Sequence, residues 1–433
     1  NRAMIITGSL IIVCVMLLLG VSVYVAFGSV LIFIALVGDQ SISGYLPTGS
    51  TGIRSLVLLA VPLFMIAGGI MEKGKIAAPL VSLAEMFIGH IKGGLSAAGV
   101  LACGIFGSIS GSANATLTCI GGIMMPHLKR ANYPTGLSAA LIVSASPLGL
   151  LIPPSASHIL YGWVAQQNVL KCFLSTVIPA IILITLLIIV NQFQLRKVTD
   201  IQLKDRPSPF MPAFAKQSRL AGPALMMPLI ILGGIYGGIM TPTEAAGIAV
   251  VYAIPIAIYF YKGLTWKTLA QTIGGSGVTI GVVMSMIFMV LIVSDNLIAQ
   301  GAPQLAKQMV YSVSENPIVI LLMINVVMIL IGMLMDDISG LLLATPILLP
   351  IAQSTGMDPI HFAAVIGVNL GMANITPPTA PLLYLGAQVC DTPVSKMLWP
   401  TLVFIIFAWL PTLMLTTFIP DLSLWLPELL LGK

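Results

Sequence analysis

Residues 371–384 read GMANITPPTAPLLY, and they combine helix-breaking and polar residues within a segment, 359–390, that has no Lys, Arg, Asp or Glu. The Pro377-Pro378 pair removes backbone amide donors and leaves carbonyls one turn earlier without helical partners. A soluble protein would place such a stretch in a surface loop, yet its flanks are strongly apolar. The stretch therefore predicts a helix that is interrupted within an apolar environment.

The composition of the whole chain explains that environment. Of its 433 residues, 58% are hydrophobic and 8% are charged, whereas charged residues make up about a quarter of an ordinary soluble domain. We therefore predict an all-α polytopic membrane protein with on the order of a dozen segments of roughly 20 residues. Long apolar runs, rather than alternation, argue against a β-barrel.

A basic segment divides the chain. Residues 196–219 form the longest polar stretch, with six Lys or Arg residues against two Asp. Because cytoplasmic loops of membrane proteins carry an excess of Lys and Arg, this linker is expected in the cytoplasm. Residues 1–195 are then the first half of the protein and residues 220–433 the second.

The same pattern occurs in both halves. A shift of 224 residues places prolines on prolines without a gap: Pro79 on Pro303, Pro126 on Pro350, and Pro153-Pro154 on Pro377-Pro378. The segment LGLLIPPSASHIL (148–160) is thus the counterpart of the opening stretch. We predict two broken helices, at about 136–165 and about 360–390.

Each half also contains a long apolar stretch with a polar or small-residue middle. The first, 93–128, contains FGSISGSANAT (106–116), and the second, 316–357, is interrupted by GMLMDDISG (332–340). A straight helix over the first stretch would be about 54 Å long, against a hydrocarbon core of about 30 Å. Because Gly, Ser and Asn favour turns, we predict two re-entrant hairpins. A tightly packed helix pair is the alternative.

These elements favour a transporter. If each half has an odd number of complete crossings, the halves have opposite orientations in the membrane. Inverted repeats with broken helices that meet near the bilayer midplane are the architecture of many secondary transporters. We therefore predict an inverted-repeat transporter with two re-entrant hairpins and two broken helices.

The broken helices offer oxygen ligands. Carbonyl oxygens at the end of a half-helix carry the negative end of its dipole, and backbone groups in hydrocarbon need a partner. The hydroxyls of Ser155, Thr376 and Thr379 add further oxygens, and such hard donors suit Na⁺ rather than a transition metal. We predict ion and solute binding at both breaks, with a structural proline kink as the alternative.

Two adjacent acids, Asp336 and Asp337, occupy the middle of the second hairpin. An ionisable residue within a membrane is costly to bury and therefore indicates a functional site. We expect Asp336 at that site, whereas Asp337 is equally consistent with a site or with the membrane edge. Glu244, in MTPTEAAGIAV (240–250), is expected to take part in capping a helix with Thr241 or Thr243.

The chain resembles the large membrane subunit of tripartite ATP-independent periplasmic (TRAP) transporters in four motifs and in their order: SISGSANAT (108–116), GLLIPPSA (149–156), GIMTPTEAAGIAVVYA (238–253) and GMANITPPTAPLLY (371–384). The resemblance covers essentially the whole chain. It implies an elevator-type importer of the bacterial inner membrane, not an enzyme. It also implies Na⁺-coupled uptake of a carboxylate-bearing solute, such as a C4-dicarboxylate, a sialic acid or another sugar acid.

The resemblance further implies partners and sites. A small four-helix membrane subunit would brace the chain in the lipid bilayer and a periplasmic solute-binding protein would deliver the solute, with no role for nucleic acid. One sodium site would comprise Gly107, Ser110, Gly149, Ile152 and Pro154, and a second would comprise Gly332, Ala373, Thr376 and Thr379. The solute would lie between them, near Ser110, Ser112, Ser155 and Asp336.

Two positions depart from the family pattern. The first hairpin of the family often reads S-G-S-A-x-A-D, but this chain has Thr116 at the acid position, and Asp337 doubles the acid of the second tip. The hairpin cores and Pro-Pro segments contain no Lys or Arg. A carboxylate would therefore be held by hydroxyls, amides, helix N-termini and bound Na⁺, so solute binding would require the cations.

Two other functions are considered from the residues alone. An intramembrane serine hydrolase would use Ser110 as nucleophile and His158 as base, but SISG (108–111) lacks the glycine that precedes the serine in a rhomboid-like turn. An ion channel is also compatible with the hairpins. A channel needs no separate solute pocket, so a pocket would distinguish the two.

Overall fold

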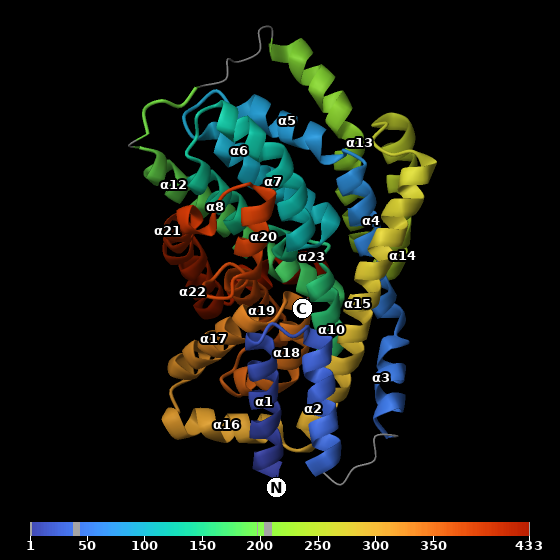
Figure 1. Ribbon diagram of the computed structural model, residues 1–433, viewed down its shortest axis with the longest axis vertical. Coiled ribbons are helices and arrows are strands. Elements are labelled where there is room, and N and C mark those ends of the chain that lie inside the picture. Colours follow the sequence, from blue (N-terminus) through green and yellow to red (C-terminus); the bar gives the residue numbers. More distant parts are fainter. Residues whose placement is uncertain (1, 38–43, 197, 203–209, 433) are drawn as a thin grey trace.

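The computed structural model describes residues 2–37, 44–196, 198–202 and 210–432, and every regular element in these ranges is a helix (Figure 1). Eight helices there are long and apolar enough to cross a membrane, or nine if one bent pair counts as a span. Five more apolar helices have 10–17 residues. The predicted all-α polytopic architecture is confirmed, with fewer long segments than the dozen or so expected.

The first half passes from single helices to a helix pair and a broken helix. Its first elements are α1 (Arg2–Leu18), α2 (Val23–Val37), α3 (Tyr45–Ile53), a 3₁₀ turn (Leu56–Leu59), α4 (Ala60–Lys73) and α5 (Ala77–Ile88). They are followed by α6 (Gly94–Ser110), α7 (Ala113–Arg130), α8 (Thr135–Ala145), α9 (Leu148–Leu151), α10 (Ala156–Val164), α11 (Val169–Ser175) and α12 (Val177–Leu195).

The second half begins inside the predicted linker, because α13 (Phe210–Tyr236) already includes its last part; residues 197 and 203–209 lie outside the described ranges. The next elements are α14 (Pro242–Pro255), a π-helical turn (Ile256–Phe260), α15 (Trp266–Ala299), α16 (Ala302–Val313), α17 (Pro317–Leu334) and α18 (Asp337–Ser354). The chain ends with α19 (Pro359–Ala373), α20 (Pro381–Val389), α21 (Val394–Phe404), a second π-helical turn (Ile405–Trp409), α22 (Leu410–Phe418) and α23 (Asp421–Leu431).

Helix bounds coincide at the offset of 224 residues. Adding 224 to the bounds of α7, 113–130, gives 337–354, which are the bounds of α18. The same shift takes α6 to 318–334, within one residue of α17, and α5 to 301–312, within one residue of α16. Both halves therefore contain a short helix, a helix pair and a Pro-Pro break in the same order. Their opposite orientation in a membrane stays a prediction.

The start of α14 follows from its sequence. The N–H of Glu244 donates to Thr241 Oγ1 (3.3 Å), and the N–H of Thr241 donates to Glu244 Oε2 (2.7 Å), which together form a capping box. The capping role predicted for Glu244 is confirmed. The hydroxyl of Thr243 donates to the carbonyl of Leu56 (2.9 Å), which ties the start of α14 to the turn before α4.

The two helix pairs lie one above the other along the long axis of the molecule (Figure 1). α6 packs against α7 in the upper half, α17 packs against α18 in the lower half, and α10 lies between them. α15 contacts α4 and α18, while α4 also contacts α6, α7, α10 and α14. The turns of both pairs therefore approach a central region that α4 and α15 border.

Candidate functional site

The first helix pair turns at Gly111. α6 ends at Ser110, Gly111 has a left-handed backbone (φ +60°), and Ser112 caps α7. A Cβ at Gly111 would lie 2.8 Å from the carbonyl oxygen of Pro154. Glycine is therefore required both by the backbone angle and by this close approach. The tip of the first pair thus lies directly against the first Pro-Pro break.

Hydroxyl groups close the first tip. Thr116 Oγ1 donates to the carbonyl of Ser112 (2.8 Å) and lies 3.2 Å from Ser110 Oγ. The side chain of Thr116 is completely buried. The residue at the expected acid position therefore holds the turn through neutral hydrogen bonds and adds no charge to this tip.

The residues predicted for the first sodium site come together. A Cβ on Gly107 would lie 2.6 Å from Gly149 Cα, so α6 and α9 meet backbone against backbone. The side chain of Ile152 lies beside α6, 3.1 Å from a Cβ built on Gly104. The helix formed by 135–151 and the helix α10 are bent by 43° across the Pro-Pro break. The break and its backbone carbonyls are thus next to the first tip.

The residues predicted for the second sodium site lie where the end of α17 meets the end of α19 and the segment that follows it. A Cβ on Gly332 of α17 would lie 2.6 Å from Ala373 Cβ at the end of α19. The hydroxyl of Thr379 donates to the carbonyl of Met333, and the hydroxyl of Thr376 donates to the preceding turn of α19 (2.7 Å). A hydroxyl that donates its proton keeps acceptor lone pairs for a cation.

The residues expected at both ion sites would offer backbone carbonyls and hydroxyls as ligands. In the described ranges, no three His, Cys, Asp or Glu side chains are grouped closely enough to hold a metal ion. A transition metal would prefer imidazole or thiolate ligands, whereas hard oxygen donors suit an alkali cation. The donor set at both breaks is therefore chemically suited to Na⁺.

The second tip carries two carboxylates with different partners. Asp336 caps α18, and its Oδ2 accepts hydrogen bonds from the N–H groups of Ile338 (3.1 Å) and Ser339 (3.4 Å). Its Oδ1 is buried and has hydrogen-bonding geometry to no described residue. Asp337 Oδ2 accepts a hydrogen bond from the hydroxyl of Ser157 on α10 (2.7 Å). Both acids therefore lie inside the protein at the junction of α18 and α10.

A cavity of about 340 Å³ lies between the two tips, α4 and α15. Three of the four residues predicted to contact the solute line it: Ser110, Ser112 and Asp336. Asp337 lines it as well. The turns of two helix pairs that are far apart in sequence thus meet at one cavity, as the repeat predicted for a central site.

Ser155, the fourth residue predicted to contact the solute, is not among the described residues that line the cavity. It is 1% exposed, its Oγ lies 3.3 Å from Nδ1 of His158, and Ala156 lines the cavity instead. Nε2 of His158 lies 3.2 Å from the carbonyl oxygen of Ala363. His158 is therefore engaged with Ser155 and α19 and not with Ser110, which argues against a hydrolase.

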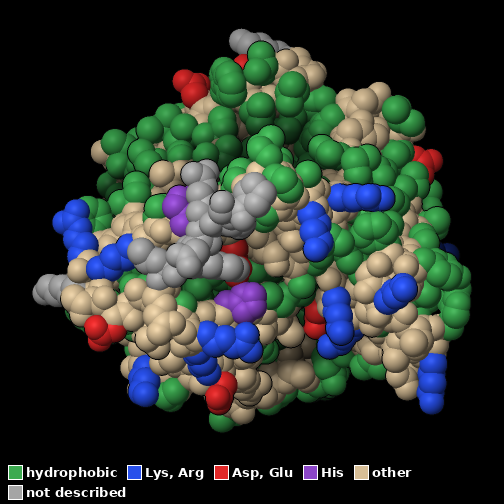
Figure 2. Space-filling model, turned by 90° about the horizontal axis from the view of Figure 1, so that it is seen from above, with side chains coloured by type: hydrophobic (Ala, Val, Ile, Leu, Met, Phe, Trp, Pro, Cys, Tyr) green, Lys and Arg blue, Asp and Glu red, His purple; other side chains and the backbone are tan. Residues whose placement is uncertain are grey.

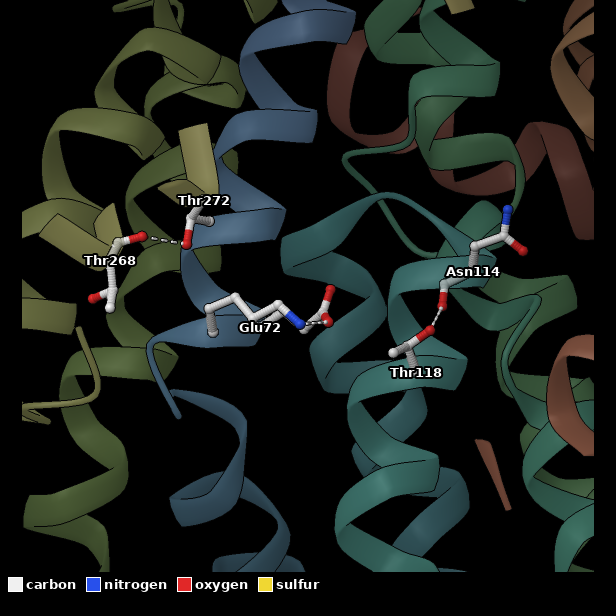
Figure 3. Close-up of polar contacts among 6 residues, drawn as sticks. Glu72, Asn114, Thr118, Thr268 and Thr272 are labelled. Atoms are coloured by element: carbon white, nitrogen blue, oxygen red, sulfur yellow. Dashed lines mark hydrogen bonds and ion pairs between the residues drawn. The ribbon is translucent and has the colours of Figure 1, made fainter. Parts of the chain in front are cut away.

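Figure 3 shows further polar residues of α4, α7 and α15 near the cavity that were not assigned to the site from the sequence. Glu72 of α4 and Asn114 and Thr118 of α7 line the cavity, and Thr118 Oγ1 donates to the carbonyl of Asn114 (2.9 Å). On α15, Thr272 Oγ1 donates to the carbonyl of Thr268 (2.8 Å). Glu72 had no signal in sequence beyond its place at the end of an apolar stretch.

The hydroxyls of α15 did have a sequence signal. Thr268, Thr272, Ser276 and Thr279 are separated by 4, 4 and 3 residues, which places their side chains on one side of a helix. Ser276 and Thr279 line the cavity, and Ser276 Oγ lies 2.7 Å from a Cβ built on Gly69 of α4. The last two residues of this periodic row of hydroxyls thus form part of the cavity wall.

Comparisons with known proteins agree on one family. The family described as "Tripartite ATP-independent periplasmic transporter, DctM component" matches residues 10–422. The chain is 35% identical to the protein YgiK of Salmonella typhimurium over 96% of this chain and 95% of that protein. It is 33% identical to the C4-dicarboxylate TRAP transporter large permease protein DctM of Pseudomonas aeruginosa, over 86% of each chain.

Other relatives are named as TRAP permeases for different solutes, namely isethionate in Oleidesulfovibrio alaskensis, sialic acid in Vibrio cholerae and ectoine in Ruegeria pomeroyi. The first of these, called DctMQ, is 32% identical, and this chain spans 64% of its length. Among solved structures, the YdaH transporter of Alcanivorax borkumensis has a similar fold, with a TM-score of 0.58 and 16% identity over 89% of this chain and 87% of that one.

Proposed function

Because the chain belongs to the DctM component family of tripartite ATP-independent periplasmic transporters, we propose that it is a sodium-driven permease for a carboxylate-bearing solute. It is a multi-pass inner-membrane transport protein. Permeases of this family work with a small membrane subunit and a periplasmic binding protein. The coupling ion, the class of solute and the movement of the site are the parts that we propose.

The cavity between the two helix tips is the observation that carries this proposal. A Pro-Pro break lies next to each tip, so backbone carbonyls and hydroxyls of the break would be available beside it. With one Na⁺ bound beside each tip, the solute would lie between the two ions. The cavity supports a transporter rather than a channel, because a channel needs no separate solute pocket.

Solute binding would depend on the ions. The described lining residues include no Lys or Arg, so the positive charge near the solute comes from helix N-termini and from bound Na⁺. The N-termini of α7 and α10 both reach the cavity, through Ser112 and Ala156. The solutes in the names of the relatives all carry a carboxylate or sulfonate group. An acidic solute would thus bind well only together with the cations, which couples the two fluxes.

We propose that the helix pairs and broken helices move together as an elevator past α4, α14 and α15. Within the proposed moving part, α6 packs on α9, α17 on α19 and α10 on α18. The cavity lies where this part meets α4 and α15. In this proposal both helix pairs are re-entrant, so that their tips carry the solute without a loop leaving the membrane.

The end of the molecule that carries α5 and α13 is proposed to face the cytoplasm. Figure 2 looks onto this end and shows Lys and Arg side chains spread around it. Contacts join its basic segments: Lys92 Nζ donates to the carbonyl of Arg196 (3.3 Å), and Lys129 lies 3.7 Å from Asp391. The excess of basic residues at one end is typical of a cytoplasmic face.

The test uses proteoliposomes that hold this chain and its small membrane subunit, with the binding protein and its solute added outside. An inward Na⁺ gradient is expected to accumulate the solute above its external concentration, and each positive charge moved inward gains about 2.3 kcal/mol per 100 mV. Accumulation that persists without Na⁺ would contradict the coupling. Equilibration of the solute without accumulation would indicate a channel instead.

A further inference from the structure

The two tips at the cavity are equivalent in position but unequal in charge. Adding 224 to Ser112 gives Asp336, and both residues cap the helix that follows; adding 224 to Ala113 gives Asp337. The first tip thus presents hydroxyls and the N-terminus of α7, and the second tip presents two carboxylates. The cavity has one end that favours an anion and one end that favours a cation.

No basic side chain balances the acidic end. Lys and Arg are absent from the described lining residues, and the third acid there, Glu72, already lies 3.2 Å from Nζ of Lys73. The N-terminus of α18 offers Asp336 the equivalent of about half a positive charge. Asp337 accepts one hydrogen bond from a neutral hydroxyl. A carboxylate in such surroundings calls for a cationic partner from outside the chain.

The direction of Asp337 is fixed by the neighbouring helix. The hydroxyl of Ser157, which is 3% exposed, donates to Asp337 Oδ2 (2.7 Å) from the first turn of α10. Ala156, the residue before Ser157, lines the cavity, as does Asp337 itself. Asp337 is therefore held at the cavity by the first broken helix.

We propose that the solute is dipolar, with a carboxylate and a cationic nitrogen, and that Asp337 determines this specificity. The carboxylate would face the tip formed by Ser110, Gly111 and Ser112, and the cationic group would face Asp336 and Asp337. This inference rests on the proposed function, since it takes the cavity to be the solute site. The volume of about 340 Å³ fits a small metabolite.

The experiment compares matched pairs of small carboxylates. The complex of this chain with its small membrane subunit, in nanodiscs at saturating Na⁺, is heated with increasing concentrations of each compound, and the rise in melting temperature gives an apparent Kd. One pair is 3-aminopropanoate and succinate, and the other is 4-aminobutanoate and glutarate. Each pair shares a carboxylate and a spacer and differs in an ammonium group against a second carboxylate.

In at least one pair, the amino acid is expected to bind at least tenfold more tightly than the dicarboxylate. Asp337→Asn is expected to remove that preference by weakening the amino acid and not the dicarboxylate. Asp421→Asn is the matched control, because Asp421 is likewise the first residue of its helix, α23, but is exposed and outside the cavity. The control is expected to keep the preference of the unmodified chain.

Three results would overturn the proposal: equal or tighter binding of the dicarboxylate in both pairs, no binding of either amino acid, or an unchanged ranking in Asp337→Asn. If that variant changed only the Na⁺ or pH dependence of stability, Asp337 would serve an ion or a proton and the proposal would fail. Sodium-driven uptake of a dicarboxylate would also overturn it, but would leave the proposed function intact. Loss of all sodium-driven accumulation would contradict the proposed function itself.

Discussion

Asp336 both caps a helix and carries a negative charge, whereas Ser112 only caps a helix. Both residues cap a helix at equivalent places in the two halves, but only Asp336 adds a charge to the cavity. Capping depends on an oxygen acceptor, whereas attraction of a cation depends on the charge of the carboxylate. Substitution at this one position can therefore separate the stability of the tip from its chemistry.

Asp336→Ser is expected to abolish sodium-driven uptake while the complex keeps its melting temperature, because serine retains the cap and removes the charge. Asp336→Ala is expected to abolish uptake and also to lower stability by about 1 kcal/mol, the usual cost of a lost N-cap. Uptake in proteoliposomes and thermal unfolding measure the two effects. Near-normal uptake by Asp336→Ser would remove this carboxylate from the site.

Gly111 offers a second test on a single residue. Gly111→Ala is expected to destabilise the first tip by about 1–2 kcal/mol, since an alanine has to adopt a left-handed backbone and its Cβ would meet the Pro154 carbonyl oxygen at 2.8 Å. Gly122→Ala in α7 is the control, because nothing lies within 4 Å of a Cβ there. Equal melting temperatures for the two variants would contradict the role assigned to Gly111.

Helices α4 and α15 contribute a wall that differs in kind from the tips. The tips and breaks are built from local sequence signals, whereas the wall joins the site through packing of α4 against α6, α7 and α10 and of α15 against α18. At Gly68, α4 lies against the first tip: a Cβ built there would be 3.6 Å from Ser110 Cβ. If the tips move as a unit past this wall, the contact between α4 and the first tip has to open in every transport cycle.

A disulfide between α4 and the first tip tests this movement. The Cβ separation of 3.6 Å at Gly68 and Ser110 is within the range of about 3.5–4.5 Å found in disulfides. The double variant Gly68→Cys/Ser110→Cys is expected to lose uptake on oxidation and to regain the level of the Ser110→Cys variant after reduction. Full uptake by the oxidised, cross-linked protein would exclude relative movement of α4 and the tip.

The whole molecule has two chemically different ends, and this difference sets its orientation. The end with α5 and α13 carries the start of α13 and many Lys and Arg side chains (Figures 1 and 2). In the sequence, residues 196–219 join the two halves that repeat each other. The side of the membrane on which this segment lies therefore fixes the orientation of both halves.

Trypsin is expected to cleave the linker, at Arg196, Lys216 or Arg219, in inside-out vesicles but not in right-side-out vesicles. The reason is that an excess of Lys and Arg retains a loop in the cytoplasm. Fragments of the two halves on a gel measure the cleavage, and detergent-solubilised protein serves as the control for access to the sites. Cleavage in intact right-side-out vesicles would reverse the orientation.

The sequence predicted the elements that are coded locally. The Pro-Pro pairs, the turn around Gly111 and the cap of Glu244 follow from residue types at fixed spacing, and the repeat indicated which of these elements belong together. It did not indicate Glu72, because one acid at the end of an apolar helix has no pattern. The sequence placed Ser155 in the solute site, whereas the structure places its hydroxyl within hydrogen-bonding distance of His158, one turn further on. Such choices depend on contacts between helices that are distant in sequence.

The small residues of α4 bear on the energy barrier to the proposed sliding movement. Gly68 and Gly69 present backbone toward the first tip and toward Ser276 of α15, with no side chain to interlock. Side chains that fit between one another resist sliding, because each has to be withdrawn from its groove before the surfaces can shift. A helix surface without side chains would let a neighbouring helix slide past it without changes of side-chain packing. A larger side chain at Gly68 is therefore expected to slow the proposed movement and also to narrow the cavity, which Gly68 lines.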